Sequence, residues 1–438
     1  MQRPPAPRSA VMNLARDNPD SANLESRHAE RADVTSIAVD LEARIAGIDE
    51  TRLRNDRLAR LRAELAKRDL AGALLFDPMN IRYATGTRNM AVWTMHAPGR
   101  YVFVATVGPV VLFEFASSLH LSRSDQREHE LRTSTPWFYF LAGPRMAEKA
   151  RHAIDEIVSL VVEFGGRNRR LAVDRCEPWG ADLLTRAGIT LVDAQEPLEH
   201  ARMIKTPEEI KCIQLSVDVC DVAIDRMRRA LRPGITENQL LSILHAANIA
   251  HGGEWIECRL LSSGPRTNPW FQESSNRVIQ SGDLVSFDTD MVGPFGYLAD
   301  LSRSFVCPDK RPSADQLHLY QAAQNQILTN MALLRPGLSF LEFAECCWPV
   351  PERYLAHRYM MMVHGAGLVD EYPSVVFKTD WDDWGYDAVF EENMVVCVES
   401  FIGESGGKEG VKLEQQVMIT AGGAVPMSRT PLVDAIEP

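Results

Sequence analysis

Helix-like segments alternate with short apolar runs between residues 49 and 198 of the chain. The apolar runs have the length of buried strands, and the segments between them have the length of helices. The pattern predicts helices at residues 50–70, near 146–163 and at 178–187, and strands at 71–77, 169–175 and 188–194. This succession predicts an α/β unit with a hydrophobic core of its own.

The longest apolar run, YVFVATVGPVVLFEFA at residues 101–116, is interrupted in its middle by Gly108 and Pro109. A membrane-spanning helix needs about 20 consecutive apolar residues, whereas a Gly-Pro pair is typical of a turn. The run therefore predicts two strands joined by a turn rather than a membrane span.

A new helix is predicted to begin after a domain boundary near residues 198–206. Thr206 is suited to be its N-cap, Pro207 its first residue, and Glu209 the other half of a capping box. Apolar residues then follow at spacings of three and four: Ile210, Ile213, Val217, Cys220, Ile224 and Met227. We expect this apolar face to pack on the core of the second domain.

Two similar segments lie in the C-terminal half, LRPGITENQL at residues 231–240 and LRPGLSFLEF at residues 334–343. In each, a helix stops at Pro-Gly and another begins at a capping box, Thr236 with Gln239 and Ser339 with Glu342. Recurrence of one unit along a chain indicates duplication. We therefore predict that the C-terminal half is a duplicated α+β unit, although Pro-Gly turns are common enough for one short repeat to arise by chance.

These patterns divide the 438 residues into three parts. Residues 1–48 have no apolar core, so they do not resemble a secretory signal, and we expect an extension that is poorly ordered or that clasps a partner subunit. Residues 49–198 form the smaller α/β domain, and residues 199–438 form the larger C-terminal domain. This length is sufficient for two or three cores.

The net charge of −12 argues against nucleic acid or an anionic membrane surface as a partner. The eight cysteines include no C-x-x-C pair, so a zinc knuckle and a dithiol redox motif are not predicted. Reduced thiols and a cytoplasmic location are the expectation.

The candidate chemistry begins with VSFDTDMVGPFGYLADLSRSF at residues 285–305, in which Asp288, Asp290 and Asp300 interrupt what otherwise resembles two buried strands. A buried, unpaired carboxylate costs several kcal/mol. Glu399 and Glu414 also lie in apolar, strand-like runs, and His364 precedes a Gly-Ala-Gly segment interpreted as a loop.

Each of these residues has an ordinary structural explanation when it is taken alone. A single buried Glu is often paired with an Arg, and a single His is often hydrogen bonded in the core. Together, five acids and one His are too many to be neutralised by Arg303, the one basic residue of the 285–305 segment. We therefore predict that they bind about two divalent cations, because oxygen ligands with one imidazole suit Mn, Fe, Co or Zn.

The order Asp, Asp, His, Glu, Glu in a duplicated C-terminal domain resembles the pita-bread family of creatinase, aminopeptidase P, prolidase and methionine aminopeptidase. The segments KTPEEI at the domain junction and DLSR around Asp300 also match that family. The resemblance covers about residues 50–430. It implies an α+β protein with a dinuclear metal centre, a smaller N-terminal α/β domain and a homodimeric state.

Several positions depart from the peptidases of this family. Asp290 stands where they carry Gly, Asp370-Glu371 stands where they carry His-Glu, and a second peptidase His is replaced within SSGPRTNPWFQES, at Trp270. The loss of both histidines disfavours Xaa-Pro hydrolysis. The departures instead resemble the dimethylsulfoniopropionate (DMSP) lyase branch of the family, through NIRYATGTRNM, HGAGLVDEYP and KLEQQV among other segments.

The resemblance to this branch implies a role for each candidate. The implied metal ligands are Asp288, Asp290, Asp300, His364, Glu399 and Glu414, with iron as the expected metal. Asp370 is the implied catalytic base and Tyr359 a pocket residue. Trp270, Phe271 and Tyr372 are further aromatic candidates for binding the dimethylsulfonium cation, although Trp270 and Phe271 would equally suit a packed hairpin corner.

Two other functions compete with the lyase. One is a metallohydrolase of the Xaa-Pro peptidase, creatinase or ectoine hydrolase type, in which Asp370 or Glu399 would move protons. The other is a non-catalytic pita-bread domain that binds proteins without metal. The second is disfavoured because all five family positions carry residues that can bind metal.

Overall fold

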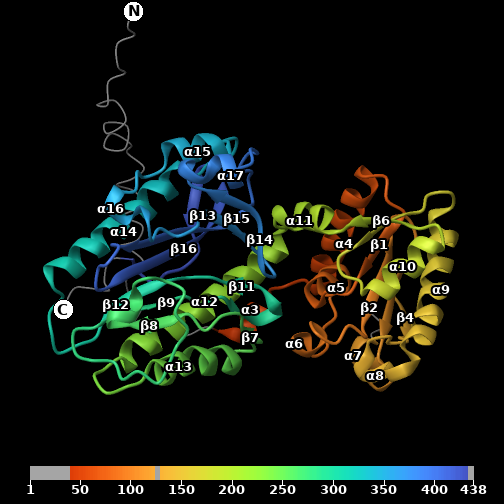
Figure 1. The fold of residues 1–438 in the computed structure, drawn as a ribbon, viewed down its shortest axis with the longest axis horizontal. Coiled ribbons are helices and arrows are strands. Elements are labelled where there is room, and N and C mark those ends of the chain that lie inside the picture. Colours follow the sequence, from red (N-terminus) through yellow and green to blue (C-terminus); the bar gives the residue numbers. More distant parts are fainter. Residues whose placement is uncertain (1–39, 124–128, 433–438) are drawn as a thin grey trace, which may run out of the picture. The chain divides into compact units, whose positions relative to one another are not determined.

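The computed structural model describes residues 40–123 and 129–432. Most of the predicted N-terminal extension, residues 1–39, lies outside this part of the chain. The chain divides into two compact units, Ile48–Glu208 and a second unit to which residues 40–47 and 209–432 belong. We describe each unit by itself (Figure 1).

The unit Ile48–Glu208 is built on one six-stranded sheet in the order β4-β3-β2-β1-β5-β6. The strands are β1 (Gly72–Leu75), β2 (Tyr101–Ala105), β3 (Val110–Glu114), β4 (Glu130–Thr133), β5 (Arg170–Val173) and β6 (Thr190–Asp193). The helices are α4 (Glu50–Lys67), α5 (Pro78–Thr85), α6 (Ala91–Thr94), α7 (Leu119–Ser122), α8 (Tyr139–Ala142), α9 (Met146–Gly165), α10 (Pro178–Arg186) and α11 (Gln195–Met203).

The helices and strands predicted for this unit are confirmed. The apolar run with Gly108-Pro109 forms the antiparallel hairpin β2–β3, and the other predicted helices and strands appear as α4, α9, α10, β1, β5 and β6. Apolar residues of α9, among them Ile154, Ile157 and Val161, pack with residues of the sheet in one core. None of the helices in the described ranges is both long and apolar enough to cross a membrane.

The second unit contains a five-stranded antiparallel sheet, β14-β13-β15-β16-β17, and two three-stranded sheets, β12-β9-β8 and β11-β10-β7. The strands of the large sheet are β13 (Met361–Ala366), β14 (Asp370–Val376), β15 (Val395–Gly403), β16 (Gly410–Thr420) and β17 (Gly423–Pro426). The strands of the small sheets are β7 (Trp255–Ile256), β8 (Leu261–Ser263), β9 (Leu284–Phe287), β10 (Met291–Val292), β11 (Leu298–Ala299) and β12 (Arg303–Val306).

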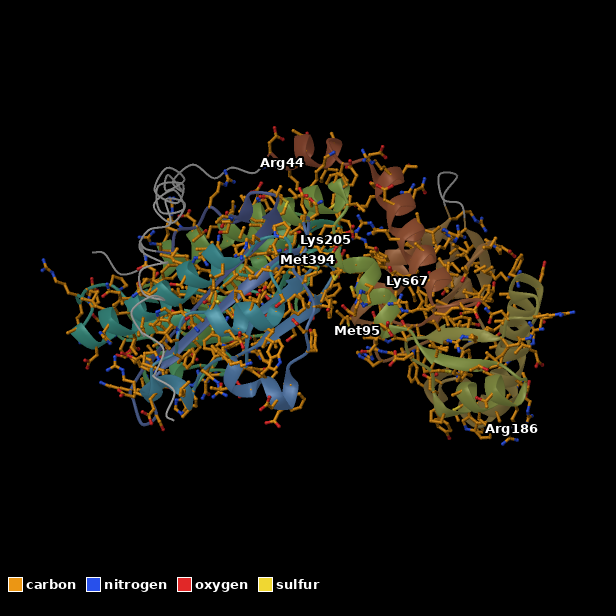
Figure 2. The ribbon with its side chains drawn as sticks, turned by 90° about the horizontal axis from the view of Figure 1, so that it is seen from above. Arg44, Lys67, Met95, Arg186, Lys205 and Met394 are labelled. Atoms are coloured by element: carbon orange, nitrogen blue, oxygen red, sulfur yellow. The ribbon has the colours of Figure 1, made fainter. Side chains whose placement is uncertain are left out.

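Helices cover these sheets. They are α3 (Leu41–Ala46), α12 (Pro207–Ala230), α13 (Glu237–Ala250), α14 (Ala314–Leu333), α15 (Phe340–Cys346), α16 (Glu352–Leu355) and α17 (Trp381–Trp384). The helix α14 packs on β15 and β16, and α13 packs on β7 and β8 (Figure 1). On α12, five of the six residues of the predicted apolar face are buried, namely Ile213, Val217, Cys220, Ile224 and Met227, whereas Ile210 is partly exposed. Arg44 of α3, labelled in Figure 2, forms an ion pair with the buried Asp218 of α12.

The duplication is visible in the backbone hydrogen bonds that follow each Pro-Gly turn. Both predicted capping boxes are present, at the start of α13 and at the start of α15. Thr236 forms an isolated antiparallel bridge with Val278, and Ser339 forms the corresponding bridge with Val389. The neighbouring amides repeat the pattern, because Gly234 N donates to Ile279 O and Gly337 N donates to Phe390 O. The two segments that follow the Pro-Gly turns therefore share one local backbone arrangement.

Two local predictions differ from the structure. Residues 285–305 form four short strands rather than two, so Asp288 and Asp300 each directly follow a strand end, after β9 and β11. The Gly-Ala-Gly segment after His364 is not a loop up to Asp370, because Gly365 and Ala366 belong to β13 and Asp370 begins β14. The glycine permits the close pairing of these strands, because a Cβ on Gly365 would lie 2.5 Å from Tyr372 O on the facing strand.

Candidate metal centre and active site

The six predicted ligands come from five segments that the sheets of the second unit bring together. Glu399 of β15 and Glu414 of β16 are paired directly across the two antiparallel strands. His364 of β13 is paired with Cys397 of β15, two residues from Glu399. Asp300 is tied to β16, because its backbone N–H donates to Gln416 Oε1 over 3.0 Å.

The remaining acids join this group through short contacts. Ser302 Oγ lies 2.6 Å from Asp288 Oδ1 and 2.8 Å from Glu414 Oε2. The backbone N–H of Asp290 lies 3.3 Å from Asp300 Oδ1. Ligand atoms of Asp288, Asp290 and Asp300 fall within 4.8 Å of one another, as do those of Asp300, His364, Cys397 and Glu414. Apart from Asp290, which is partly buried, the six predicted ligands are buried.

The two ring nitrogens of His364 face different surroundings. Its Nε2 lies 3.2 Å from Glu399 Oε1, 3.6 Å from Glu414 Oε1 and 3.8 Å from Asp300 Oδ2. Its Nδ1 lies 3.1 Å from Gly365 O and 3.5 Å from Asp370 Oδ1. A ligand His commonly binds metal through one nitrogen while the other is held by a carbonyl or carboxylate. The geometry therefore makes Nε2 the nitrogen that faces the ligand carboxylates, and Nδ1 the nitrogen whose contacts hold the ring in place.

Crowding perturbs the acids in a way that favours a cation between them. Burial, together with the neighbouring Glu414, raises the pKa of Asp288 to about 6 although Lys412 opposes the shift. Burial and Glu414 likewise raise the pKa of Glu399 to about 7. Burial and the charge of Asp288 raise the pKa of Asp290 well above its usual value. A cation placed among these groups stabilises their ionised forms.

The residues present fit a metal centre. Glu414 Oε1 is fully buried and has no hydrogen-bond partner among the described residues, which is costly unless another atom occupies the space beside it. Five carboxylates and one imidazole make a donor set typical of Mn, Fe, Co or Zn. The Cys397 thiol, within reach of Asp300, His364 and Glu414, adds a softer donor to the same group.

Two neighbours of the ligands were not predicted from the sequence. Lys412 Nζ lies 2.6 Å from Glu399 Oε2 and 3.1 Å from Asp288 Oδ2, and Cys397 Sγ lies 3.7 Å from Asp300 O. Each stands two residues before a ligand Glu on the same strand. Because side chains two apart on a strand share one face, this spacing was a signal that could have identified both.

Asp370, the predicted base, begins β14 at the margin of the cluster. Its side chain is 58% exposed, and its Oδ1 lies 3.5 Å from His364 Nδ1. Its pKa is raised by partial removal from water and by Glu414, while His364 opposes the shift. The adjacent Glu371 is buried and accepts a hydrogen bond from the backbone N–H of Leu368 over 2.9 Å, which holds the turn before Asp370.

Two of the predicted aromatic residues lie beside Lys412, and a third stacks on one of them. The ammonium group lies 4.6 Å from the ring centre of Tyr359 and 5.8 Å from that of Trp270. Phe271 stacks on Tyr359 with the ring centres 5.4 Å apart, and it is 61% exposed. Tyr372 lies elsewhere, stacked on Tyr386 at 5.6 Å in a group that includes Phe340. The structure thus brings Tyr359, Trp270 and Phe271 together, and places Tyr372 with other aromatic residues.

The segment that carries Trp270 and Phe271 is held by a buried carboxylate. Glu237, at the start of α13, accepts hydrogen bonds from the backbone N–H groups of Ser263 and Ser275, over 2.9 and 3.0 Å. It also forms an ion pair with Arg266. One side chain therefore joins both ends of the segment that bears these aromatic residues.

We expect Glu237→Ala to lower the free energy of unfolding by about 3–5 kcal/mol, because it leaves several buried donors without an acceptor. Chemical denaturation followed by circular dichroism measures the change. Glu392→Gln, at an exposed acid, is the control and should match the wild type. A loss below about 1 kcal/mol for Glu237→Ala would contradict this role.

Comparison with known proteins places the chain in a family. Residues 57–204 match the creatinase/prolidase N-terminal domain, and residues 211–421 match the metallopeptidase family M24. An Xaa-Pro dipeptidase from Bacillus anthracis has the same fold, with a TM-score of 0.69 and 21% identity over 86% of this chain and 98% of its own. A prolidase from Pyrococcus furiosus gives a TM-score of 0.66 at 18% identity over 84% and 99% of the two chains.

Two curated relatives are more similar in sequence, and both are named dimethylsulfoniopropionate lyase DddP. The protein from Roseovarius nubinhibens is 38% identical over 89% of this chain and 88% of its own length. The protein from Roseobacter denitrificans is 35% identical over 97% of this chain and 93% of its own length. The chain therefore belongs to the pita-bread family of M24 and creatinase-type proteins, and within it to the group of the dimethylsulfoniopropionate lyases DddP.

Proposed function

We propose that this enzyme is a metal-dependent lyase that cleaves DMSP to dimethyl sulfide and acrylate. The observation that carries the proposal is the similarity to two proteins named DMSP lyase along nearly their full lengths. The site supports it, because an acid and histidine cluster suited to metal lies beside an exposed aspartate, Asp370.

The proposed reaction requires two contributions from the site, charge stabilisation and a proton acceptor. DMSP carries a carboxylate at one end and a dimethylsulfonium group at the other. Its β-elimination removes a proton from the carbon beside the carboxylate, and the electron pair left behind forms the double bond of acrylate as dimethyl sulfide departs. A bound metal supplies charge stabilisation at the substrate carboxylate. A protein base must accept the proton.

We propose that Asp370 is that base. A general base must reach the proton that it takes, and Asp370 is the acid of this group whose side chain is largely exposed. Contact with His364 Nδ1 at 3.5 Å orients its carboxylate. The raised pKa of Asp370 brings its basicity closer to that needed near neutral pH.

The sulfonium end requires a site for a cation. We propose that Trp270, Phe271 and Tyr359 provide it, because aromatic faces attract cations, as the position of the Lys412 ammonium group over the rings of Tyr359 and Trp270 illustrates. Because Lys412 lies over Tyr359 and Trp270, the substrate cation would approach from the side of Phe271, which stacks on Tyr359 and is 61% exposed. Tyr372 remains a candidate because of its position two residues after Asp370.

The proposal also extends to the metal, the cellular location and the oligomeric state. The metal centre is proposed to hold two divalent ions, with iron as the metal that the resemblance favours and manganese, cobalt or zinc as alternatives. The enzyme is proposed to act in the cytoplasm as a homodimer. The free state of all eight cysteines agrees with a reducing compartment. Elemental analysis and light scattering of the purified protein test the metal and the oligomeric state.

A second function, that of a metallohydrolase, is also compatible with the match to the metallopeptidase family M24. The discriminating experiment measures dimethyl sulfide in the headspace above purified protein with DMSP, in parallel with cleavage of an Xaa-Pro dipeptide. We expect release of dimethyl sulfide that stops on addition of a chelator and returns with metal. Dipeptide cleavage without release of dimethyl sulfide would replace the lyase by the hydrolase.

A further inference from the structure

A fully buried lysine lies inside the carboxylate cluster. Lys412 of β16 has no exposed surface, and its Nζ lies 2.6 Å from Glu399 Oε2, 3.1 Å from Asp288 Oδ2 and 3.3 Å from Glu414 Oε2. Ser302 Oγ, at 2.7 Å, is a further partner. Charged groups are rarely buried without such partners, so three ligand carboxylates are the counter-charge that keeps this ammonium group in place.

In Glu399 and in Glu414, one carboxylate oxygen faces Lys412 and the other faces His364. In Glu399, Oε2 faces Lys412 whereas Oε1 faces His364 Nε2 at 3.2 Å. In Glu414, Oε2 faces Lys412 whereas Oε1 has no hydrogen-bond partner among the described residues and lies 3.6 Å from His364 Nε2. In each Glu, one oxygen is thus held by the lysine and the other is turned to the side of the ligand histidine.

The ammonium group is closed off from solvent. The rings of Tyr359 and Trp270 lie over it at 4.6 and 5.8 Å. Because Lys412 also has several oxygen partners and no exposed surface, its ammonium group is not accessible to a substrate carboxylate. Its positive charge acts on the cluster itself.

Counting formal charges links the lysine to the number of ions. The five predicted ligand carboxylates carry five negative charges, and Lys412 carries one positive charge. The four negative charges that remain are matched by two divalent cations. Without Lys412, the five negative charges of the ligands would exceed the four positive charges of two divalent ions by one.

We propose that Lys412 is a permanent cation of the metal centre, which sets the charge of the ligand cluster to that of two divalent ions. Lys412 thus acts on the metal through the charge of the ligand cluster. The inference rests on the metal centre of the proposed function but not on its substrate. It predicts opposite effects of one substitution on the metal-free protein and on metal affinity.

Lys412→Met tests the proposal, because it retains most of the side-chain volume without the charge. The metal-free variant should unfold at a lower temperature than the metal-free wild type, since the carboxylates lose their counter-charge. It should also bind Mn²⁺ at least tenfold more tightly, because a like charge close to the ions is removed in a medium of low dielectric constant. The rise in unfolding temperature on addition of Mn²⁺ should therefore be larger than in the wild type.

The proteins are purified with Mn²⁺, and the affinity is measured by competition with a chelator, so a variant that unfolds without metal still gives a value. Lys412→Arg keeps the charge and should bind Mn²⁺ within about threefold of the wild type. Arg277→Met is the matched control, because Arg277 is a partly buried cation paired with Asp283, outside the cluster; it should not tighten Mn²⁺ binding.

Unchanged or weaker Mn²⁺ binding by Lys412→Met would overturn the proposal, as would equal tightening by Lys412→Arg. Release of dimethyl sulfide is measured separately. If Mn²⁺ binding changes as predicted while the wild-type protein releases no dimethyl sulfide, the role of Lys412 stands and the proposed lyase function fails.

Discussion

Asp370→Asn is expected to reduce the release of dimethyl sulfide by about a thousandfold or more while the bound metal stays nearly unchanged. Asparagine has the size of aspartate, but its amide does not accept a proton at neutral pH, so a general base is lost without a change in packing. Removal of such a base typically costs two to four orders of magnitude in rate. The largest change in this protein is therefore expected at a residue that holds no metal in our proposal.

The structure explains why metal content should survive this substitution. Asp370 is 58% exposed and contacts the cluster through His364 Nδ1, whereas the predicted ligand atom Nε2 faces Glu399, Glu414 and Asp300. Gly365 O, 3.1 Å from Nδ1, still supports the ring in the variant. The ligand set therefore stays intact when Asp370 becomes neutral.

The measurement pairs headspace dimethyl sulfide with elemental analysis of the same preparation. Asp382→Asn, an exposed acid on α17, serves as the control and should retain wild-type turnover. If Asp370→Asn turned over DMSP at the wild-type rate, Asp370 would not be the base. If it lost its metal instead, Asp370 would have to be counted among the ligands.

Asp290→Gly is expected to lower the metal content by about half or more and to leave the stability of the fold nearly unchanged. Asp290 has a φ of +32°, in the left-handed region that favours glycine, so its backbone is strained by on the order of 1 kcal/mol. Glycine relieves this strain but adds a similar conformational entropy to the unfolded chain. The two backbone effects nearly cancel, and the loss of a carboxylate remains.

The contacts of Asp290 indicate that its carboxylate has a functional role at this strained backbone position. Its N–H lies 3.3 Å from Asp300 Oδ1, and Cys258 Sγ donates to its Oδ2. A backbone outlier among acidic side chains is the kind of strain that functional sites retain. We therefore expect Asp290→Gly to act on the metal rather than on folding.

Metal content and thermal unfolding are measured on the same samples, and Asp309→Gly provides the matched control. Asp309 is an exposed aspartate with a φ of +72° outside the cluster, so its replacement tests the backbone effect without a ligand. It should keep the full metal content. Full metal content in Asp290→Gly as well would remove Asp290 from the proposed ligands.

The helices and strands of this protein were largely predictable because they depend on local patterns. The buried face of α12 follows from apolar residues three and four positions apart, and the hairpin β2–β3 follows from Gly108-Pro109 in an apolar run. The capping boxes at Thr236 and Ser339 were likewise predicted from neighbouring residues. Such interactions join residues a few positions apart, so they are visible in any short stretch of the chain.

The candidate site was predictable in its residue types but not in its charge balance. Acids in apolar strands indicated a metal centre, because burial of so many negative charges requires a counter-charge. The sequence did not indicate that Lys412 would be part of that counter-charge, since a lysine near a strand end is usually exposed. The pairing of β15 with β16 brings Lys412 to Glu399, thirteen residues away.

By itself, then, the sequence determined the duplicated α+β architecture, the family and the set of acids and histidine that suits a metal. Only the tertiary structure decided that Lys412 and Cys397 join this set, that Asp370 begins a strand, and that Tyr372 lies with Tyr386 rather than with Tyr359. The physical reason is that backbone periodicity acts over neighbouring residues. Electrostatic and packing partners are instead chosen by strand register, which joins residues far apart in the chain.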